Sequence, residues 1–592
     1  MHHLSAREPD APASRPIKAL TLCLAWLCLA LPQPVHAQAS RAAPEPPTLQ
    51  AAEPALAERH MVVAAHPLAA RAGREMLRKG GSAVDAAIAA QMVLGLVEPQ
   101  SSGLGGGAFL IHHDAENGEL TAWDGRETAP AAATPERFLG ADGSPARWPE
   151  MVPGGLSVGV PGMLAMVAAV HDRHGVLPWA DLFEPAIRLA REGFGVSPRL
   201  AALLRDDDPE AFSPAARAYF YDADGEAWPL GHVLTNDAYA DTLERIAAEG
   251  PSAFYDGEIA GDVAAAVREA WRNPGDLSAA DMAAYEVVER EPVCAPYRGH
   301  EVCGMGPPSS GAHTVGMTLA MLERFDLGTE PTPRAMHLVA EAEKLAFADR
   351  DRYIADPDFV DVPDGLLDPR YLGERSGLIE RYQSMGRAEA GTPPGSRRSP
   401  GTDGTKEAPS TSHISVVDAD GNVVSMTTTI ESGFGSRLMA RGFLLNNELT
   451  DFSFAPDDED GRPVANRVEA GKRPRSSMAP TIVLGPDGRP VFVMGSPGGS
   501  RIIPYVVKAV IALVDWGMDP QQAAALFNFG SRNGPFEIER MPGAERWRAQ
   551  IEPFGHEVTL AEMTSGLHII ALRDGRLEGG ADPRREGEAA GD

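Results

Sequence analysis

The sequence changes character abruptly between Ser410 and Thr411, and this junction limits the possible folds most strongly. Residues 391–410, GTPPGSRRSPGTDGTKEAPS, hold Pro, Gly, Ser, Thr and charged residues with almost nothing apolar to bury, which is typical of a mobile surface segment. From Thr411 the chain reads TSHISVVDADGNVVSMTTTI, two β-rich runs around a turn at residues 418–422 that predict a hairpin. An ordered strand should therefore begin where a mobile segment ends.

The sequence before the junction is dominated by helical patterns up to about residue 390. HPLAARAGREMLRKGG predicts a helix closed by Gly80 and Gly81. Ser82 and Asp85 form a capping-box pattern ahead of AAIAAQMVLGLV, which is apolar nearly all round and should be buried. PRAMHLVAEAEKLAFADRDRYI predicts a further helix.

Strand pairs and helices alternate after the first hairpin. APTIVLGPDGRPVFVMG predicts a second strand pair, and SPGGSRIIPYVVKAVIALVDWG predicts a Gly-rich turn leading into an apolar helix. Strand pairs with helices on either side predict an α+β fold of stacked antiparallel sheets covered by helices. The hydrophobic content of 43% is sufficient for a large core.

The N-terminus has the pattern of a secretory signal over residues 1–37. Arg15 and Lys18 precede the apolar run ALTLCLAWLCLAL, and Ala37 closes an A-x-A-like small-residue pattern. Removal after Ala37 is favoured over an uncleaved anchor, because the apolar run is shorter than the ~20 residues that a bilayer span needs. We expect an exported protein, periplasmic or secreted, without a stable membrane anchor after signal removal. Residues 38–57, rich in Ala, Pro and Glu, read as a disordered tether.

Charge and cysteine usage narrow the possible partners. Acidic residues outnumber basic ones by 83 to 53, and the resulting net charge of −30 repels phosphate backbones, which argues against nucleic acid as a partner. Cys23 and Cys28 lie within the signal. Cys294 and Cys303 flank the turn-like segment PYRGH, so they form either a disulfide of an exported protein or two free buried thiols.

The junction also suggests a reaction. The Thr411 hydroxyl could attack the carbonyl carbon of Ser410, and water could cleave the resulting ester, which would free the α-amine of Thr411. An α-amine has a pKa of about 7.7–8.0, so near neutral pH it can act as base for its own hydroxyl. A threonine at the start of a strand is most often only a β-former, so this interpretation depends on other residues.

Seven segments, including the one that begins at Thr411, occur in a characteristic order. They are SSGLGGGAF (101–109), GRETAP (125–130), PPSSG (307–311), TSHISVVDADGN (411–422), LLNNELTDFS (444–453), GKRPRSSMAPTI (471–482) and GSPGGSRII (495–503). Together they resemble γ-glutamyltranspeptidases over roughly residues 58–585. The resemblance implies the four-layer αββα sandwich of N-terminal nucleophile hydrolases. It also implies self-cleavage between Ser410 and Thr411 into a large subunit, 58–410, and a small catalytic subunit, 411–592, which remain associated as a heterodimer.

The resemblance implies roles for four catalytic residues. Thr411 matches the nucleophile, and Thr429 matches a second threonine whose hydroxyl hydrogen-bonds the first. Gly498 and Gly499 match a pair whose N–H groups hold the oxyanion, and losing such a donor costs ~2.7–4 kcal/mol of transition-state stabilisation. Neither a cofactor nor a metal is implied, and GLGGG at residues 103–107 lacks the Lys and Ser/Thr of a phosphate-binding loop and precedes a strand.

The same match implies how a γ-glutamyl group is recognised. Arg126 matches the arginine that binds the α-carboxylate, with a bidentate fork that lysine lacks. Ser476 and Ser477 would add hydroxyl donors to this carboxylate. Glu448 and Asp451 would bind the α-ammonium.

Two features depart from many family members. Glu431 stands where many carry Asn, and reads as a further ammonium contact or as a change in substrate preference. Residues 452–474, FSFAPDDEDGRPVANRVEAGKRP, are acidic and lack the tyrosine that many members carry on a lid over the pocket. This difference predicts a more open site with different acceptor selectivity.

The implied activity is hydrolysis of γ-glutamyl compounds such as glutathione, with transfer of the γ-glutamyl group to amino acid or peptide acceptors. A related glutaryl or cephalosporin-type acylase is the alternative. In such an enzyme Glu431, Glu448 and Asp451 would lack a substrate cation to face, and would repel one another. A non-catalytic binding protein on the same scaffold is a third interpretation, disfavoured by the retention of Thr411 and Thr429.

Overall fold

The structure is a computed structural model that describes residues 53–396, 400–405, 407, 410–573 and 575–592. The predicted signal, residues 1–37, and most of the predicted tether lie outside the described residues. The expected end of the tether at residue 57 is wrong, because Ala55–Ala57 form strand β1, which pairs antiparallel with β20 (Arg576–Ala581). Three residues are too few for a periodic pattern, and their pairing depends on a distant strand.

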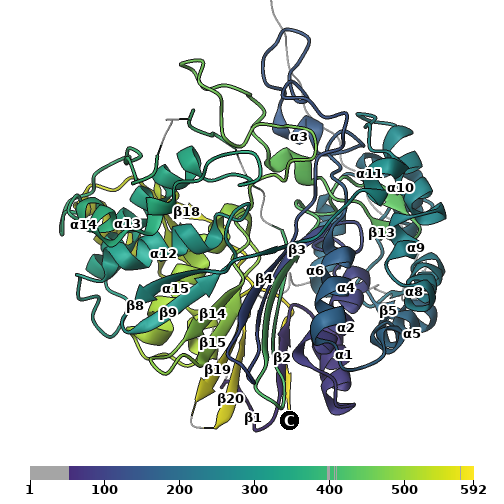
Figure 1. The fold of residues 1–592 in the computed structure, drawn as a ribbon, viewed down its shortest axis with the longest axis horizontal. Helices are drawn as coiled ribbons and strands as arrows, with labels where there is room; N and C mark the ends of the chain where they lie inside the picture. The colour runs from purple at the N-terminus through teal and green to yellow at the C-terminus, as the bar shows by residue number, and fades with distance from the viewer. Residues whose placement is uncertain (1–52, 397–399, 406, 408–409, 574) are drawn as a thin grey trace, which may run out of the picture. The chain divides into compact units, whose positions relative to one another are not determined.

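Two seven-stranded sheets, antiparallel throughout, form the centre of the fold (Figure 1). In spatial order the first sheet contains β21 (Glu588–Gly591), β2 (Met61–Ala64), β10 (Ser412–Val417), β11 (Val423–Thr429), β3 (Gly107–His113), β4 (Leu120–Gly125) and β7 (Val288–Arg290). The second contains β1, β20, β19 (His568–Arg573), β15 (Pro490–Gly495), β14 (Thr481–Leu484), β9 (His300–Gly304) and β8 (Val293–Tyr297). Smaller pieces are β5 (Phe194–Gly195), β6 (Val233–Leu234), β12 (Met439–Ala440), β13 (Phe443–Leu444), β16 (Phe529–Gly530), β17 (Phe536–Glu539) and β18 (Val558–Ala561).

Helices cover the outer face of each sheet. Against the first sheet lies a group formed by α1 (Pro67–Arg78), α2 (Ala83–Val97), α4 (Met163–His174), α5 (Glu184–Glu192), α6 (Pro198–Asp206), α7 (Pro214–Phe220), α8 (Asp237–Glu249), α9 (Ser252–Tyr255) and α10 (Glu258–Arg268). Against the second lies a group formed by α12 (Gly311–Leu322), α13 (Pro333–Tyr353), α14 (Pro369–Ser376), α15 (Ile502–Val514), α16 (Pro520–Ala525) and α17 (Ala544–Ile551). Two further short helices are α3 (Trp148–Met151) and α11 (Ala279–Ala283). None of the helices in the described residues is long and apolar enough to cross a membrane.

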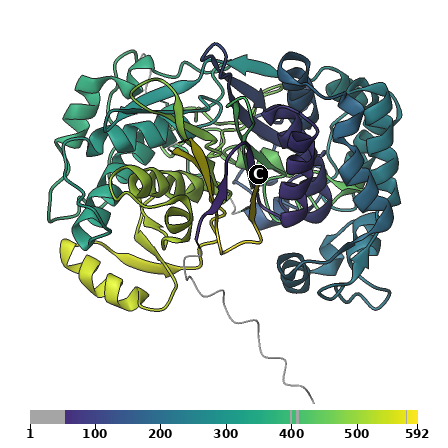
Figure 2. The same ribbon diagram turned by 90° about the horizontal axis from the view of Figure 1, so that it is seen from below.

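The layers run helix, sheet, sheet, helix, which confirms the predicted four-layer αββα sandwich (Figure 1). The alternation of side chains along a strand separates two cores. Val62 of β2 packs with the α1 and α2 layer, whereas its neighbour Val63 packs with the second sheet. Figure 2 shows the same separation from below, with purple and blue helices on one side and teal to yellow helices on the other.

The strongest local sequence patterns correspond to real elements. Helices α1, α2, α13 and α15 lie where they were predicted, and so do the hairpins β10–β11 and β14–β15. Ser82 accepts a hydrogen bond from the backbone N–H of Asp85 and Asp85 accepts one in return, so the predicted capping box is confirmed. Every residue of α2 is buried, as its all-round apolar pattern predicted.

The part of the chain before residue 390, in which helices were expected to dominate, also contributes strands to both sheets. This part of the chain supplies β2, β3, β4 and β7 to the first sheet and β1, β8 and β9 to the second. Strands β10 and β11, which follow the junction, lie between β2 and β3, and β14 pairs with β9. Ile88 and Ile414, from the two sides of the junction, belong to one core. The two predicted subunits are therefore interleaved within the same sheets.

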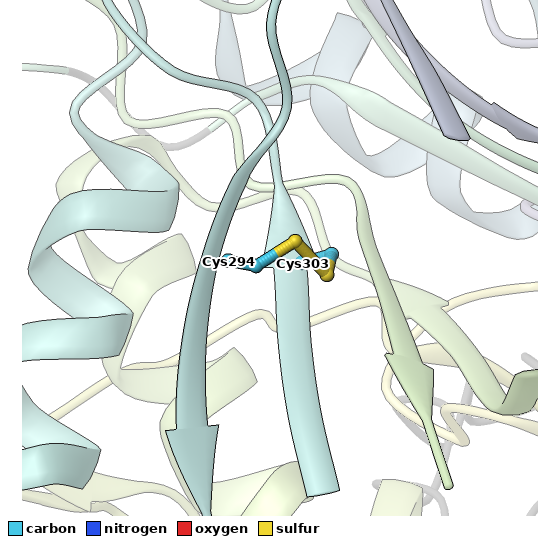
Figure 3. The surroundings of a disulfide bond; sticks show 2 residues. All are labelled: Cys294 and Cys303. Atoms are coloured by element: carbon cyan, nitrogen blue, oxygen red, sulfur yellow. A yellow bond between two sulfur atoms is a disulfide. The ribbon is translucent and has the colours of Figure 1, made fainter. Parts of the chain in front are cut away.

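Cys294 and Cys303 form a disulfide (Figure 3). They lie directly opposite each other on the neighbouring strands β8 and β9, and their Cα atoms are 4.0 Å apart. The hairpin around PYRGH produces this pairing, so the alternative of two free thiols is wrong for this structure.

The segment before the junction, residues 391–410, has no helix and no extended strand in its described residues, in line with its composition. It is nevertheless not confined to the surface. Asp403 and Ser410 are buried, and the side chain of Glu407 is only 5% exposed. The Asp403 carboxylate lies 2.9 Å from the buried guanidinium of Arg475, and the Glu407 carboxylate contacts that of Arg350. These two acidic side chains enter the protein because buried cations pair with them.

Candidate active site

A small cavity collects most of the residues that the sequence singled out. It is lined by Arg126, Glu407, Thr411, Thr429, Glu431, Glu448, Asp451, Ser476, Ser477, Met478, Gly499 and Ile502. Its volume of about 20 Å³ has room for roughly one water molecule. The uncut chain therefore fills its own pocket.

The sheet register brings Thr411 and Thr429 together. Strand β10 begins at Ser412 and β11 ends at Thr429, and the pairing of Ser412 with Thr428 places Thr411 beside Thr429. Their hydroxyl oxygens are 3.2 Å apart, and Thr429 Oγ also accepts a hydrogen bond of 2.8 Å from the N–H of Glu431. Thr429 is thus placed to accept a hydrogen bond from the Thr411 hydroxyl. This hydrogen bond orients a lone pair of Thr411 Oγ.

The carbonyl oxygen of Ser410 accepts a hydrogen bond of 3.0 Å from the N–H of Gly498. Gly498 has a φ of +142°, and a Cβ there would lie 2.7 Å from a ring carbon of Tyr505, so only glycine fits without displacement. Gly499 follows in a single 3-10 turn ahead of helix α15. The bond between Ser410 and Thr411 therefore presents its carbonyl oxygen to an N–H donor before any substrate is bound.

The backbone of Thr411 is strained. Its φ of +87° lies in the left-handed region, which a β-branched residue rarely adopts, and such a conformation costs about 1–3 kcal/mol. Arg585 donates a hydrogen bond of 3.0 Å from Nη1 to the Thr411 carbonyl and is itself buried, which lowers its pKa to about 9. Sequence reasoning missed Arg585, since no local pattern marks an arginine that acts on a residue 174 positions away.

The proposed substrate-recognition charges pair with one another in the uncut chain. Arg126 donates from Nη1 to Glu448 and from Nη2 to Asp451, the latter at 2.6 Å. Burial and then the charge of Glu431 raise the pKa of Asp451 well above its usual range, and burial also raises the pKa of Glu448. Burial and then Glu448 raise the pKa of the adjacent Glu127. The cation expected to bind the substrate α-carboxylate and the anions expected to bind its α-ammonium therefore pair with each other here.

Ser476 and Ser477 lie in the same cavity but do not contact Arg126 through any hydrogen bond of the described residues. Ser476 Oγ accepts from the N–H of Met478 at 3.1 Å. Ser477 Oγ accepts from Nη2 of Arg350 at 2.6 Å, and that guanidinium also contacts the Glu407 carboxylate. Glu431 accepts a hydrogen bond of 2.6 Å from the amide of Asn447.

A larger groove lies beside this cavity. Its volume is about 800 Å³, and it is lined in part by residues 402–405 of the segment before the junction and by much of the acidic segment 452–464. Thr450 and Phe452 line the groove, and Asp451 between them in the sequence lines the cavity. The predicted effect of the missing lid tyrosine on acceptor selectivity stays a prediction.

The sequence implied no metal site, but the described residues contain one group of side chains that could hold a metal ion. His337, Glu341 and His556 place ligand atoms within 4.8 Å of one another. The ammonium of Lys344 lies 2.8 Å from Glu341 and 3.4 Å from Nδ1 of His556. His556 and His337 are 2.7 Å apart through ring nitrogens, and the far nitrogen of His337 faces the Glu380 carbonyl at 2.8 Å. The Lys344 ammonium is thus the positive charge beside Glu341. From it a chain of hydrogen bonds runs through His556 and His337 to the Glu380 carbonyl.

The chain is similar to known proteins over most of its length. The profile of the family described as gamma-glutamyltranspeptidase matches residues 69–592. The glutathione hydrolase proenzyme of Escherichia coli (strain K12) is 37% identical over 564 residues, covering 92% of this chain and 95% of the relative. That of Bacillus subtilis (strain 168) is 34% identical over 589 residues, covering 97% and 98%. The crystal structure of cephalosporin acylase from Bacillus halodurans has a TM-score of 0.81 and 28% identity, covering 93% and 98%.

Proposed function

Because the chain belongs to the γ-glutamyltranspeptidase family, an enzyme family of the N-terminal nucleophile hydrolase class, we propose that it cuts itself between Ser410 and Thr411 and then cleaves γ-glutamyl amides such as glutathione. The observation that carries this proposal is the environment of the Ser410 carbonyl. Its oxygen lies 3.0 Å from the N–H of Gly498, while the hydroxyl of the next residue, Thr411, lies against Thr429. Nucleophile, electrophile and oxyanion donor thus meet at one peptide bond.

The self-cleavage follows from this arrangement. Thr411 Oγ attacks the Ser410 carbonyl carbon, the C–N bond breaks, and the nitrogen takes the hydroxyl proton and becomes the α-amine of Thr411. Gly498 stabilises the negative oxygen of the intermediate. Water then hydrolyses the ester between Ser410 and Thr411. This yields a new carboxyl terminus at Ser410 and a second chain that begins at Thr411 with a free α-amine. The positive φ of Thr411 supports the first step, because breaking the bond releases the strain.

The free threonine then serves in each turnover. Its α-amine, with an ordinary pKa of about 7.7–8.0, takes the proton of Thr411 Oγ as this oxygen attacks the γ-carbonyl of the substrate. The amine part of the substrate leaves, and the γ-glutamyl group stays on Thr411 as an ester. Water completes hydrolysis, whereas an amino acid or peptide acceptor completes transfer.

An acylase acting on glutaryl groups is the second candidate, and the cephalosporin acylase similarity favours considering it. A glutaryl group is a γ-glutamyl group without its α-ammonium. Glu431, Glu448 and Asp451 all line the cavity, and a substrate ammonium would offset their mutual repulsion. We therefore propose γ-glutamyl over glutaryl substrates. Turnover of γ-glutamyl and glutaryl 4-nitroanilides by one preparation decides between them.

Export completes the proposal. The disulfide between Cys294 and Cys303 supports an oxidising compartment, because cytosolic thiols are kept reduced. The signal expected at residues 1–37 lies outside the described residues. Cleavage after Ala37 would leave a large fragment that begins at Gln38.

The decisive experiment is intact-mass analysis of the wild type and of Thr411→Ala. We expect the wild type to yield two fragments, one beginning near Gln38 and one at Thr411. Thr411→Ala should remain a single chain without activity, because it lacks the attacking oxygen. Thr411→Ser, which retains a hydroxyl, is the matched control and should be cut. Two normal fragments from Thr411→Ala would refute the mechanism.

A further inference from the structure

Arg585 is a buried cation beside the proposed nucleophile. It lies on the turn between β20 and β21. Its Nη1 donates to the Thr411 carbonyl at 3.0 Å, and its Nε and Nη2 donate to the Thr564 carbonyl at 3.4 Å and 3.2 Å. The stem is enclosed as well, because a Cβ on Gly566 would lie 2.8 Å from Arg585 Cδ. The guanidinium is therefore fixed against the residue that self-cleavage turns into an N-terminus.

The charge of Arg585 is not neutralised by a directly paired acid. Its donors face carbonyl oxygens, and no carboxylate of the described residues forms an ion pair with it. The neighbouring Arg584 differs, because it pairs with Glu539 at 2.6 Å and with Asp582 at 2.9 Å. Burial and then the charge of Arg199 lower the pKa of Arg585 to about 9, so it remains charged near neutral pH. A buried charge of this kind acts on its surroundings, because little solvent screens it.

This charge lies close to the nitrogen that the cut turns into an α-amine. Three bonds within Thr411 separate its carbonyl oxygen from its nitrogen, so Arg585 Nη1 lies within about 7 Å of that nitrogen. The cut breaks the bond on the other side of the nitrogen, whereas the carbonyl leads directly into strand β10. The first residue of β10, Ser412, is also held, since its hydroxyl donates to Glu98 at 2.8 Å. The new α-amine therefore remains near a fixed positive charge.

Other titratable groups also face Thr411. The cavity side carries Arg126, Glu407, Glu431, Glu448 and Asp451. The side of β10 and its neighbours carries Glu98, Arg199, His413, Tyr505, His568 and Glu586.

The acids of this set have partners of their own. The partners are Arg126 for Glu448 and Asp451, Arg350 for Glu407, the Asn447 amide for Glu431, Ser412 and Arg199 for Glu98, and the Arg199 N–H for Glu586. Burial raises the pKa of Glu98, Glu448 and Asp451, which reduces their negative charge. Burial also lowers the pKa of both histidines and raises that of the tyrosine, so these three rings are neutral. Among all these groups Arg585 is the cation without a paired acid.

We propose that Arg585 positions Thr411 through its carbonyl and keeps the α-amine of the mature enzyme neutral at physiological pH, able to accept the hydroxyl proton. This inference rests on the proposed function. A fixed cation disfavours the protonated amine, so it lowers the pKa of this amine from its ordinary value of about 7.7–8.0. The amine can then take the proton of Thr411 Oγ, and the ammonium so formed passes that proton to the departing amine of the substrate. Arg585 acts through Thr411 and is a positioning residue.

The test is the pH dependence of kcat/KM for γ-glutamyl-4-nitroanilide, whose acid limb reports the base of the free enzyme. Arg585→Gln removes the charge but retains N–H donors for the Thr411 carbonyl. Its acid limb should move to higher pH by about 0.4–1.7 units, the effect of a unit charge at ~7 Å for an effective dielectric constant of about 80 to 20. KM should change little, and the activity relative to wild type should recover as pH rises. Arg585→Lys keeps the charge and should keep the wild-type limb.

Two controls separate this effect from damage to the fold. Arg489→Gln makes the same change of charge at an exposed residue between β14 and β15, which pairs with Asp487, and should leave the acid limb unchanged. Self-cleavage of Arg585→Gln, followed by intact mass, should keep the wild-type pH dependence, because the Thr411 nitrogen is an amide until the bond is cut. Thermal unfolding confirms that each variant is folded.

The outcomes that contradict the proposal are specific. An acid limb that does not move to higher pH in Arg585→Gln, or that moves equally in Arg585→Lys, would overturn it. If Arg585→Gln does not fold or is not cut, the wild type decides: an acid limb below about 7.7 supports the proposal, and one at or above that value overturns it. A wild type that is not cut, or that turns over no γ-glutamyl compound, would instead refute the proposed function.

Discussion

Replacing Thr429 by valine tests whether its hydroxyl activates Thr411. The change is nearly isosteric, but it removes the acceptor that lies 3.2 Å from Thr411 Oγ and 2.8 Å from the N–H of Glu431. Losing a partner and leaving a buried N–H unsatisfied costs about 1–3 kcal/mol. If this cost falls on the transition state, self-cleavage slows about 5- to 160-fold, at 1.36 kcal/mol for each factor of ten.

The assay is the fraction of uncut chain against time after purification, followed by intact mass. Turnover of γ-glutamyl-4-nitroanilide by the cut fraction gives a second reading. Thr429→Ser retains the hydroxyl and should be cut at close to the normal rate. Thr428→Val removes a buried hydroxyl of the same strand that lies 3.4 Å from the Gly107 carbonyl, and should have little effect. Unslowed cleavage of Thr429→Val, or equal slowing of Thr428→Val, would refute the reasoning.

Two further predictions concern stability, and both are measured by urea unfolding in the uncut Thr411→Ala background. Ser82→Ala removes the cap of α2 and should lower the free energy of unfolding by about 1 kcal/mol, whereas an unchanged midpoint would contradict the capping box. Burial raises the pKa of Glu343 to about 8, so between about pH 4.5 and 8 this group is protonated when folded and ionised when unfolded. Stability should therefore fall as pH rises through this window, by up to about 1.4 kcal/mol per unit, and Glu343→Gln should flatten the decline. A slope equal to that of the parent would argue against a buried neutral Glu343.

Much of the fold could be predicted because its signals are local. The apolar sequence of α2 and its cap lie within one short segment, and so do the two runs that form β10 and β11. Strand β1 carries no such signal, because three residues become a strand only through the partner β20. The burial of Asp403 and of the Glu407 side chain escaped prediction for a related reason. A polar composition shows that a segment cannot build a core, but not that a buried arginine will pair with its acids.

The candidate site likewise contains residues that the sequence indicated and pairings that only the fold produces. Roles for Thr411, Thr429 and Gly498 could be foreseen, since each lies in or beside a segment that resembles the family. Arg350 and Glu407 are 57 positions apart and meet only through the packing of α13 against the junction segment. The pairing of Arg126 with Glu448 spans 322 positions. The resemblance implied that Arg126 and Glu448 recognise a substrate, but not that they pair with each other while the pocket is closed.

Because strands from both sides of the junction are interleaved in one sheet, the cut changes what refolding requires. Before the cut, unfolding and refolding are events within one molecule. Afterwards β10 and β11 belong to a separate polypeptide that lies between β2 and β3, so refolding becomes an encounter of two chains whose success depends on concentration. The lifetime of the cut enzyme then depends on its rate of unfolding, because reassembly requires two chains to meet. Fragments of different molecules should not exchange, and an inactive fragment should remain with the partner beside which it folded.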